Sequence, residues 1–208
     1  LRADDQIGLA RLEDLDGAFR WYARQLTEDP SDPHVRDQLH RLASVGGDWA
    51  GLAATYQRVL DDDSGDAPHL RELAIAAAAI YDRRLDAAGP GGAAYRRALA
   101  ATPPVDDDRL PLLSRAEALL GRHQQWATLV GIYDDVIAVG GDDALRRDLY
   151  ARKAAVLEER LIDLPGAVDA WRAVVELADG LAARLDYQRA ADALDRLYRG
   201  LERWHDLA

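Results

Sequence analysis

The residues with the clearest capacity for acid–base chemistry in this sequence are aspartates in adjacent pairs. Three pairs stand out, at Asp106–Asp107, Asp134–Asp135 and Asp142–Asp143. Two carboxylates act as acid and base when both face the same substrate. Adjacent residues of a helix point in different directions, so these pairs do not converge. We therefore predict solvated helix starts and faces at these positions, no catalytic residue, and a protein that is not an enzyme.

A metal centre requires histidine, cysteine or carboxylate ligands gathered in one place. Cysteine is absent, and no two of the five histidines have the i, i+4 spacing that places two ligands on one helical face. The acidic stretch Asp61–Glu72 resembles a calcium loop, but Gly65 falls at its fifth position instead of the sixth, and Pro68 interrupts it. No glycine-rich nucleotide loop is present. We predict no metal and no cofactor.

The charge and hydropathy of the chain exclude two broad classes. Asp and Glu outnumber Lys and Arg by 37 to 26, for a formal charge of −11. Such a chain repels phosphate backbones, so we predict that it binds no nucleic acid. The longest apolar run, Leu73–Tyr81, is much shorter than the roughly 18 residues of a membrane span, and we predict none.

The composition also bears on origin and location. Lys153 is the one lysine, and the chain is rich in arginine, alanine and aspartate, as is typical of proteins from GC-rich bacteria. The chain begins at Leu1 and contains no methionine, so we expect a processed chain or a segment of a longer one. We predict a cytoplasmic protein. A periplasmic location is the alternative, because a targeting segment would precede Leu1.

Two short motifs recur along the chain. The first is Arg-Leu followed, ten residues after the leucine, by an aromatic residue, with copies at Arg11–Tyr22, Arg84–Tyr95 and Arg160–Trp171. The second is Trp-x-x-Leu-x-x-x-Tyr, with copies at Trp49–Tyr56 and Trp126–Tyr133 and a third beginning at Trp204. Recurrence at a period of a few tens of residues is typical of stacked supersecondary units.

The aromatic residue that closes each motif marks one repeat. Successive markers are 34, 39, 38 and 38 residues apart, at Tyr22, Tyr56, Tyr95, Tyr133 and Trp171. Each interval has the length of one helical hairpin. Alternate copies resemble each other most and are 76 or 77 residues apart, which indicates a superperiod of two hairpins. The markers fall on apolar stripes at helical spacing, so we expect their rings in the core and not in a ligand-stacking ladder.

The residues between the apolar stripes predict where helices begin and end. Asp32 is suited to cap a helix with Pro33 in its first turn, and Gly46–Gly47 is suited to end that helix. The stripe Trp49–Leu60 then completes a hairpin. The sequence Gly-Pro-Gly-Gly at 89–92 predicts a turn within another hairpin.

In these features the chain resembles the tetratricopeptide-repeat family. In the family pattern a small residue of the second helix precedes an aromatic by four positions, and a proline follows eight later; Ala18, Tyr22 and Pro30 match it, and Tyr95 with Pro103 repeats the last two. The resemblance implies an all-α fold, a right-handed α-solenoid of antiparallel helical hairpins with about 5.5 repeats of 34–39 residues. It implies a single domain over residues 1–208, as a segment of a longer array.

The resemblance also implies a groove, lined by the first helix of each hairpin, that binds peptides or protein surfaces. Basic residues on the expected first helices would form a strip suited to an acidic peptide. The predicted groove residues are Arg41, Arg71, Arg115, Arg147, Lys153 and Arg189. The alternative is that these side chains pair with neighbouring carboxylates on solvent faces.

We therefore predict a non-enzymatic protein–protein interaction scaffold that binds a peptide or protein along its concave face. The alternative is a regulatory or interaction domain of a larger enzyme or signalling protein whose catalytic part lies outside this chain. An enzyme that gathers carboxylates in a central cavity is a third reading, and the spacing of the aspartate pairs argues against it. At the C-terminal end, Trp204 and Leu207 begin an apolar face that we expect more chain or another subunit to cover.

Overall fold

The computed structural model describes residues 3–62, 67–104, 106–178 and 184–201, with the side chains of residues 3–13 and 67 left aside. All regular structure in these ranges is helical, which confirms the all-α prediction. The chain divides into two compact units, Leu1–Thr102 and Pro103–Ala208, and each is described by itself. The expectation of one domain over residues 1–208 stays a prediction.

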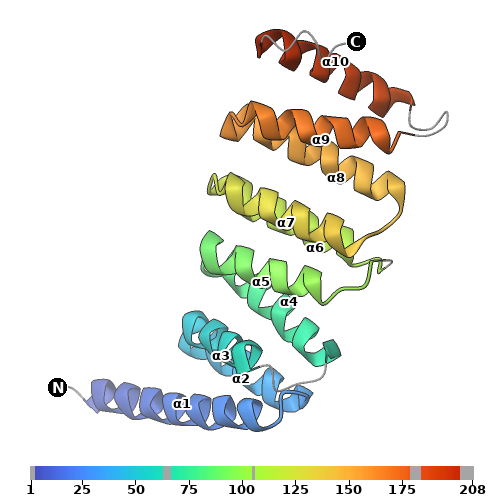
Figure 1. Cartoon of the computed structure of the whole chain (residues 1–208). Helices are drawn as coiled ribbons and strands as arrows, with labels where there is room; N and C mark the ends of the chain where they lie inside the picture. The colour runs from blue at the N-terminus through green and yellow to red at the C-terminus, as the bar shows by residue number, and fades with distance from the viewer. Residues whose placement is uncertain (1–2, 63–66, 105, 179–183, 202–208) are drawn as a thin grey trace. The chain divides into compact units, whose positions relative to one another are not determined.

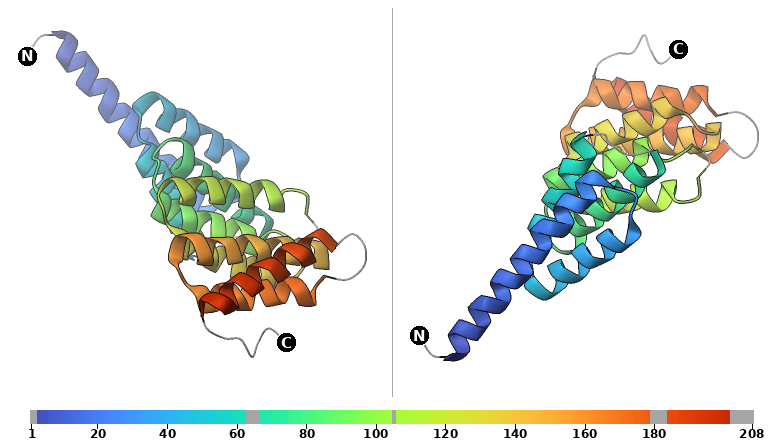
Figure 2. Two further views of the ribbon diagram at one scale, coloured as in Figure 1. Left: turned by 90° about the horizontal axis from the view of Figure 1, so that it is seen from above. Right: turned by 90° about the horizontal axis from the view of Figure 1, so that it is seen from below.

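The first unit contains five helices: α1 (Ala3–Glu28), α2 (Pro33–Gly46), α3 (Trp49–Asp62), α4 (Ala67–Arg83) and α5 (Ala88–Ala100). Each packs against the next, and α1 also touches α3 (Figure 1). The connections are short, so consecutive helices lie antiparallel as hairpins. The N-terminal half of α1 extends beyond α2 and α3 (Figure 2).

The second unit repeats this pattern. Its elements are α6 (Arg109–Arg122), α7 (Trp126–Val139), α8 (Asp143–Val156), the π-helical turn η1 (Leu157–Leu161), α9 (Leu164–Glu176) and α10 (Arg184–Gly200). Again each helix packs against its successor, and η1 also contacts α7 and α9. Hairpins of similar length thus follow one another within each unit.

The predicted helix boundaries in the shortest repeat are confirmed. The Asp32 carboxylate accepts a hydrogen bond of 2.8 Å from the His34 N–H, and Pro33 fills the first position of α2. This arrangement satisfies one of the N–H groups that the first turn leaves free. At the other end, Gly47 has φ +75°, the left-handed conformation in which glycine carries no steric cost.

The prediction of a turn at 89–92 is wrong, because these residues form the first turn of α5. Proline is tolerated there, since the N–H that it lacks would have no acceptor within the helix. Gly91 and Gly92 are buried, and their missing side chains allow α5 to lie close against α4. The turn lies earlier, around Asp86, which has φ +46°.

Four of the five marker aromatics lie in the core, as predicted, whereas Tyr22 is only half-buried. Tyr56, Tyr95, Tyr133 and Trp171 are all 3% exposed or less. The polar atoms of three of these rings reach carboxylates on the preceding helix segment: Tyr95 bonds Asp82 at 3.1 Å, Tyr133 bonds Glu117 at 2.7 Å, and Trp171 approaches Glu158 at 3.5 Å. Because the hydroxyl or indole N–H has such a partner, burial of the ring costs little free energy for its polar atom.

Turn conformations recur between the two units. Gly47 and Gln124 both have positive φ, at +75° and +56°, and so do Asp86 and Ile162, at +46° and +55°. These pairs are 77 and 76 residues apart. The hydrogen bond from the Ala87 N–H to the Tyr81 carbonyl, 2.9 Å long, has a counterpart of 2.9 Å between Asp163 and Leu157. Equivalent sequence copies therefore adopt the same local backbone.

Candidate functional site

The six predicted groove residues all lie on even-numbered helices. They are Arg41 on α2, Arg71 on α4, Arg115 on α6, Arg147 and Lys153 on α8, and Arg189 on α10. In each hairpin counted from α2, the even-numbered helix comes first. The positions therefore agree with the expected first helices, whereas the contacts of the side chains differ from one residue to the next.

In the first unit the two arginines behave differently. Arg41 is exposed, and its guanidinium donates to the Gln38 side chain on the same helix at 2.8 Å. Arg71 is half-buried, and its Nε donates to the Thr102 hydroxyl at 3.1 Å. Arg71 thereby ties α4 to the end of α5, and Arg41 leaves its charge toward solvent.

In the second unit three of the four residues contact other helices. Arg147 is 12% exposed, and it bonds Asp186 of α10 at 2.8 Å and the Leu177 carbonyl at 3.3 Å. Lys153 lies 2.5 Å from the Asp134 carboxylate of α7. A third contact joins α10 to α9, where Arg189 lies over the Trp171 ring at 5.5 Å. Arg115 is exposed. Binding of an acidic peptide by these residues stays a prediction.

Ion pairs at repeat spacing connect neighbouring hairpins. Three join even-numbered helices: Arg36 to Glu72 at 2.5 Å, Arg152 to Glu117 at 3.0 Å and Arg147 to Asp186 at 2.8 Å. Another joins odd-numbered helices, from Arg97 to Asp61 at 2.8 Å. The partners are 35 to 39 residues apart in sequence, so each pair links one repeat to the next.

Several shifted pKa values follow from burial and from these pairs. The hydrogen bond from Arg36 lowers the pKa of Glu72, and the bond from Arg97 lowers that of Asp61. Burial raises the pKa of Tyr56 to about 12 and raises that of Tyr133 further. Each group lies in a contact that holds helices together.

One buried cation was not foreseen from the sequence. Arg109, at the start of α6, is 2% exposed, and its guanidinium donates to the Val136 carbonyl of α7 at 3.2 Å. Burial lowers its pKa. Its place between two apolar helices, α6 and α7, indicates a structural role. No signal in the sequence indicates that Arg109 is buried, because polar residues are common at helix starts. Its buried position forms only when α7 packs against α6.

The acidic residues singled out in the sequence have separate environments. Asp142 caps α8 through the Leu145 N–H at 2.6 Å, which confirms the predicted helix start at that pair. Asp134 is an exposed residue within α7 and pairs with Lys153. Residues 63–66 of the calcium-like stretch lie outside the described ranges. Within those ranges no group of three or more His, Asp or Glu side chains is arranged to hold a metal ion.

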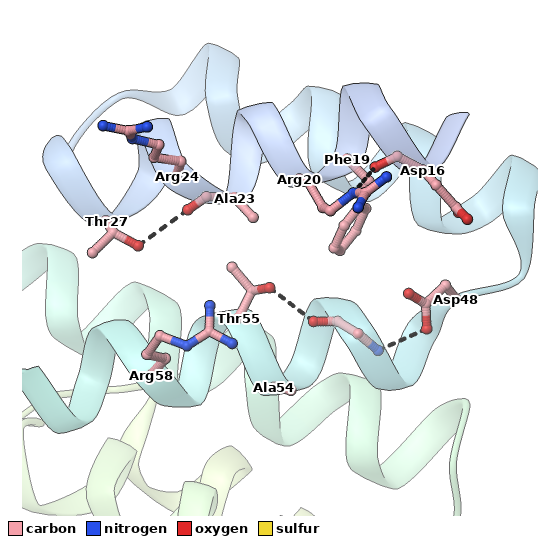
Figure 3. A pocket seen from close by; sticks show the side chains of 11 residues that line it. Asp16, Phe19, Arg20, Ala23, Arg24, Thr27, Asp48, Ala54, Thr55 and Arg58 are labelled. Carbon is pink, nitrogen blue, oxygen red and sulfur yellow. Dashed lines mark hydrogen bonds between the residues drawn. The ribbon is translucent and has the colours of Figure 1, made fainter. Parts of the chain in front are cut away.

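A hollow on the first unit lies between α1 and α3. It has a volume of about 690 Å³ and is lined by Asp16, Phe19, Arg20, Ala23, Arg24 and Thr27 of α1 and by Asp48, Gly51, Ala54, Thr55 and Arg58 of α3. We call this hollow the α1/α3 groove (Figure 3). Both helices run along it in the same direction, so their side chains form two facing rows.

The α1/α3 groove has chemically distinct ends. Asp16 and Asp48 lie at one end, and Arg58 and Thr27 lie toward the other (Figure 3). The Asp48 carboxylate caps α3 through the Gly51 N–H at 2.8 Å. A Cβ at Gly51 would lie 2.1 Å from that carboxylate, so a larger residue there would require the Asp48 side chain to shift.

Sequence reasoning missed this groove because it considered only first helices. The groove lies on α1 and α3, and the markers Tyr22 and Tyr56 assign both to the second helices of their hairpins. A signal was nevertheless present: the α1 lining residues recur at i, i+3, i+4, i+7, i+8 and i+11, a stripe on one face of a helix. Because the stripe mixes charged and small residues, it does not have the appearance of a core face.

Smaller hollows occur in the second unit. One of about 420 Å³ lies between α7, α8 and α9, and its polar lining is Asp134, Lys153, Tyr150, Asp163 and Asp169. Another of about 270 Å³ lies beside α10, where Arg189 and Arg196 meet Glu158 and Trp171. Lys153 and Arg189 therefore line different hollows.

The described residues define a class: an all-α protein of the helical-repeat type. No protein-family model matches the chain, and no curated protein matches it. Among solved structures the chain is similar to BtubC (BKLC) from P. vanneervenii, with 13% identity and a TM-score of 0.44 over 94% of this chain and 85% of that one. In the part of the chain that the structure describes, no helix has the length and apolar character of a bilayer span.

Proposed function

We propose that this chain is a non-enzymatic protein–protein interaction scaffold of the tetratricopeptide type. In this proposal its hairpins form a right-handed solenoid, and its even-numbered helices present the binding face to a peptide or protein partner. The family resemblance of the repeat motifs supports the solenoid. Within each unit every helix packs against the next one, and this arrangement supports the solenoid independently of the sequence motifs.

The observation that carries this proposal is the set of ion pairs between even-numbered helices. Arg36 reaches Glu72 from α2 to α4, Arg152 reaches Glu117 from α8 to α6, and Arg147 reaches Asp186 from α8 to α10. Ion pairs of this kind require neighbouring even-numbered helices to lie side by side within each unit. The resulting layer in each unit is charged; Arg41 adds an exposed cation in the first unit and Arg115 adds one in the second.

A layer of this kind suits recognition of a protein segment. The helices are fixed by buried aromatics and ion pairs before a partner arrives, so less conformational entropy is lost on binding. Exposed arginines steer an acidic partner toward the layer and fix its register. Their attraction is screened by salt, because both groups are exposed.

The proposal is tested with a pool of fluorescent acidic peptides of about ten residues, measured by anisotropy against the full chain. We expect binding that weakens several-fold between about 0.05 M and about 0.5 M salt and weakens again in the Arg41→Glu, Arg115→Glu double variant. Binding that is insensitive to both changes would contradict the even-helix face. Mass spectrometry of the incubated pool checks the non-enzymatic part, since we expect the peptides to remain unchanged.

A further inference from the structure

The α1/α3 groove is separate from the even-helix layer. Several polar side chains that line it are not fully engaged by contacts within the chain. α1 rests mainly on α2 and touches α3 over a smaller area. Small residues, Ala23, Gly51 and Ala54, occupy the positions where the two helices face each other. A hollow of about 690 Å³ therefore stays open between them.

The cations of the groove have few partners among the described residues. Arg58 forms no hydrogen bond or ion pair with any described residue, and Arg20 donates only to the Asp16 backbone carbonyl at 3.3 Å. Arg24 pairs with Glu28 on its own helix at 3.1 Å, and both side chains are more than half exposed. An exposed pair of this kind is worth little, so Arg24 can exchange its partner. Three guanidinium groups are therefore available to carboxylates.

The middle of the groove is suited to an apolar side chain. Phe19, Ala23 and Ala54 line it. The hydroxyls of Thr27 and Thr55 donate to the carbonyls one turn earlier, at 3.1 Å to Ala23 and 2.8 Å to Gly51. Thr55 is 3% exposed and Thr27 is half-buried, so only the Thr27 hydroxyl has a lone pair within reach of a backbone N–H of a ligand.

The length of the groove sets the size of the ligand. Thr27 lies eleven positions after Asp16 on the α1 stripe, which is about 16 Å at the rise of an α-helix. An extended chain covers that distance with about five residues. The two ends differ in charge, because Asp16 and Asp48 lie at one end and Arg58 toward the other. A ligand with the opposite polarity would be held in one orientation.

We propose that the α1/α3 groove binds a short extended segment of a partner protein that has carboxylates at one end, an apolar side chain in its middle and a basic residue at the other end. Its carboxylates meet Arg58 and Arg24, since Arg20 lies beside Asp16 at the other end of the groove. The apolar side chain lies over Phe19, and the basic residue reaches Asp16 and Asp48. This proposal deepens the scaffold function and rests on it, but it concerns a different face of the first unit.

The test uses two fluorescent peptides, Glu-Asp-Gly-Leu-Gly-Lys-Lys and its reverse, because the backbone direction in the groove is open. A control peptide has the same composition with the charges interspersed. We expect one of the two polar peptides to bind the full chain with a Kd of about 10–100 μM and the control peptide to bind at least about tenfold more weakly.

Three variants locate the binding. Arg58→Glu should weaken binding by at least about tenfold, since it removes a charge-assisted bond and adds repulsion. Ala54→Trp should block the middle of the groove, and its exposed position makes it compatible with folding. Arg41→Glu distinguishes the groove from the even-helix layer, because it removes an exposed cation of that layer and none of the groove. Circular dichroism melts establish that each variant is folded.

Several results would overturn the proposal. Absence of binding by both polar peptides would do so, as would binding that survives Arg58→Glu and Ala54→Trp. Binding lost in Arg41→Glu and retained in Arg58→Glu would place the peptide on the even-helix layer, which supports the scaffold function and removes this site. A concentration-dependent mass that Arg58→Glu reduces to one chain would assign the groove to a second copy instead.

Discussion

The guanidinium of Arg84 lies over the ring of Trp49, with its carbon 4.4 Å from the ring centre. In the second unit Arg160 lies over Trp126 at 5.2 Å. The arginines are 76 residues apart in sequence and the tryptophans 77. Each contact joins the two recurring motifs, because the Arg-Leu copy of one hairpin meets the Trp-x-x-Leu copy of the hairpin before it. The two motifs are therefore two halves of one repeated contact.

This contact should contribute measurably to stability. In a double-mutant cycle of Arg84→Gln and Trp49→Leu, we expect a coupling of about 0.5–1 kcal/mol, measured by urea unfolding. The cycle subtracts the edge contact of Trp49 with His40 at 5.0 Å, which both Trp49 variants lose. A matched cycle with Arg83→Gln, an exposed neighbour at the end of α4, should give no coupling. Equal coupling in the two cycles would refute the contact.

The buried and exposed aromatics should differ strongly in their effect on stability. Tyr56 is 2% exposed, and its truncation to alanine should lower the free energy of unfolding by about 3–5 kcal/mol. Trp21 is 57% exposed, so Trp21→Ala should cost less than about 1 kcal/mol. Thermal melts followed by circular dichroism compare the two variants. Similar losses would contradict the burial of Tyr56 or the exposure of Trp21.

The buried tyrosines should make the chain sensitive to alkali. Burial raises the pKa of Tyr56 to about 12 from an ordinary value near 10, and it raises that of Tyr133 as well. A raised pKa contributes stability that is fully present below the unfolded value, and that stability is lost as pH rises through the folded value. The window of loss for Tyr56 therefore lies between about pH 10 and pH 12.

The measurement is a circular dichroism titration over that window. We expect the wild-type chain to unfold within it and a Tyr56→Phe, Tyr133→Phe double variant to stay folded to higher pH. Phenylalanine fills the same space and has no proton to lose, although Tyr133→Phe also gives up the bond to Glu117. Comparison at neutral pH isolates that loss. Coincident alkaline transitions, after this correction, would show that the tyrosines are not responsible.

Ile162 is a site where a substitution should increase stability. It has φ +55° and is 68% exposed, and left-handed backbone costs a β-branched residue about 1–2 kcal/mol. Asn tolerates that conformation better, so Ile162→Asn should raise the free energy of unfolding by about 0.5–1 kcal/mol. Val45 is equally exposed but lies in the right-handed helix α2. Val45→Asn is therefore the control, and a gain of the same size there would argue against relief of strain.

Most of the helical framework could be predicted from short-range signals. Asp32 with Pro33 and Gly47 marked the ends of α2, because capping and left-handed termination involve residues within one turn of each other. Tyr56 and Tyr133 were predicted to be buried because their apolar neighbours recur at helical spacing. The prediction of a turn at 89–92 was wrong because it too used only local signals. Glycine and proline also suit the first turn of a helix that packs closely against its neighbour.

The candidate sites depended on long-range contacts, and the sequence predicted less of them. The basic strip was assembled from charge and position alone, yet Arg147 reaches Asp186 and Lys153 reaches Asp134. These partners are 39 and 19 residues away. Spacing within a helix carries no information on which of many aspartates in other helices a side chain will meet.

The sequence by itself thus determined the hairpins, their repeat length and the burial of four of the five marker aromatics, since each of these follows from local periodicity. Tertiary packing decided which charged side chains pair within the chain and which remain available to a partner. Arg58 has no described partner, and the α1/α3 groove exists, because α1 rests mainly on α2 and small residues face it from α3. That arrangement depends on contacts between helices, which no single helix encodes.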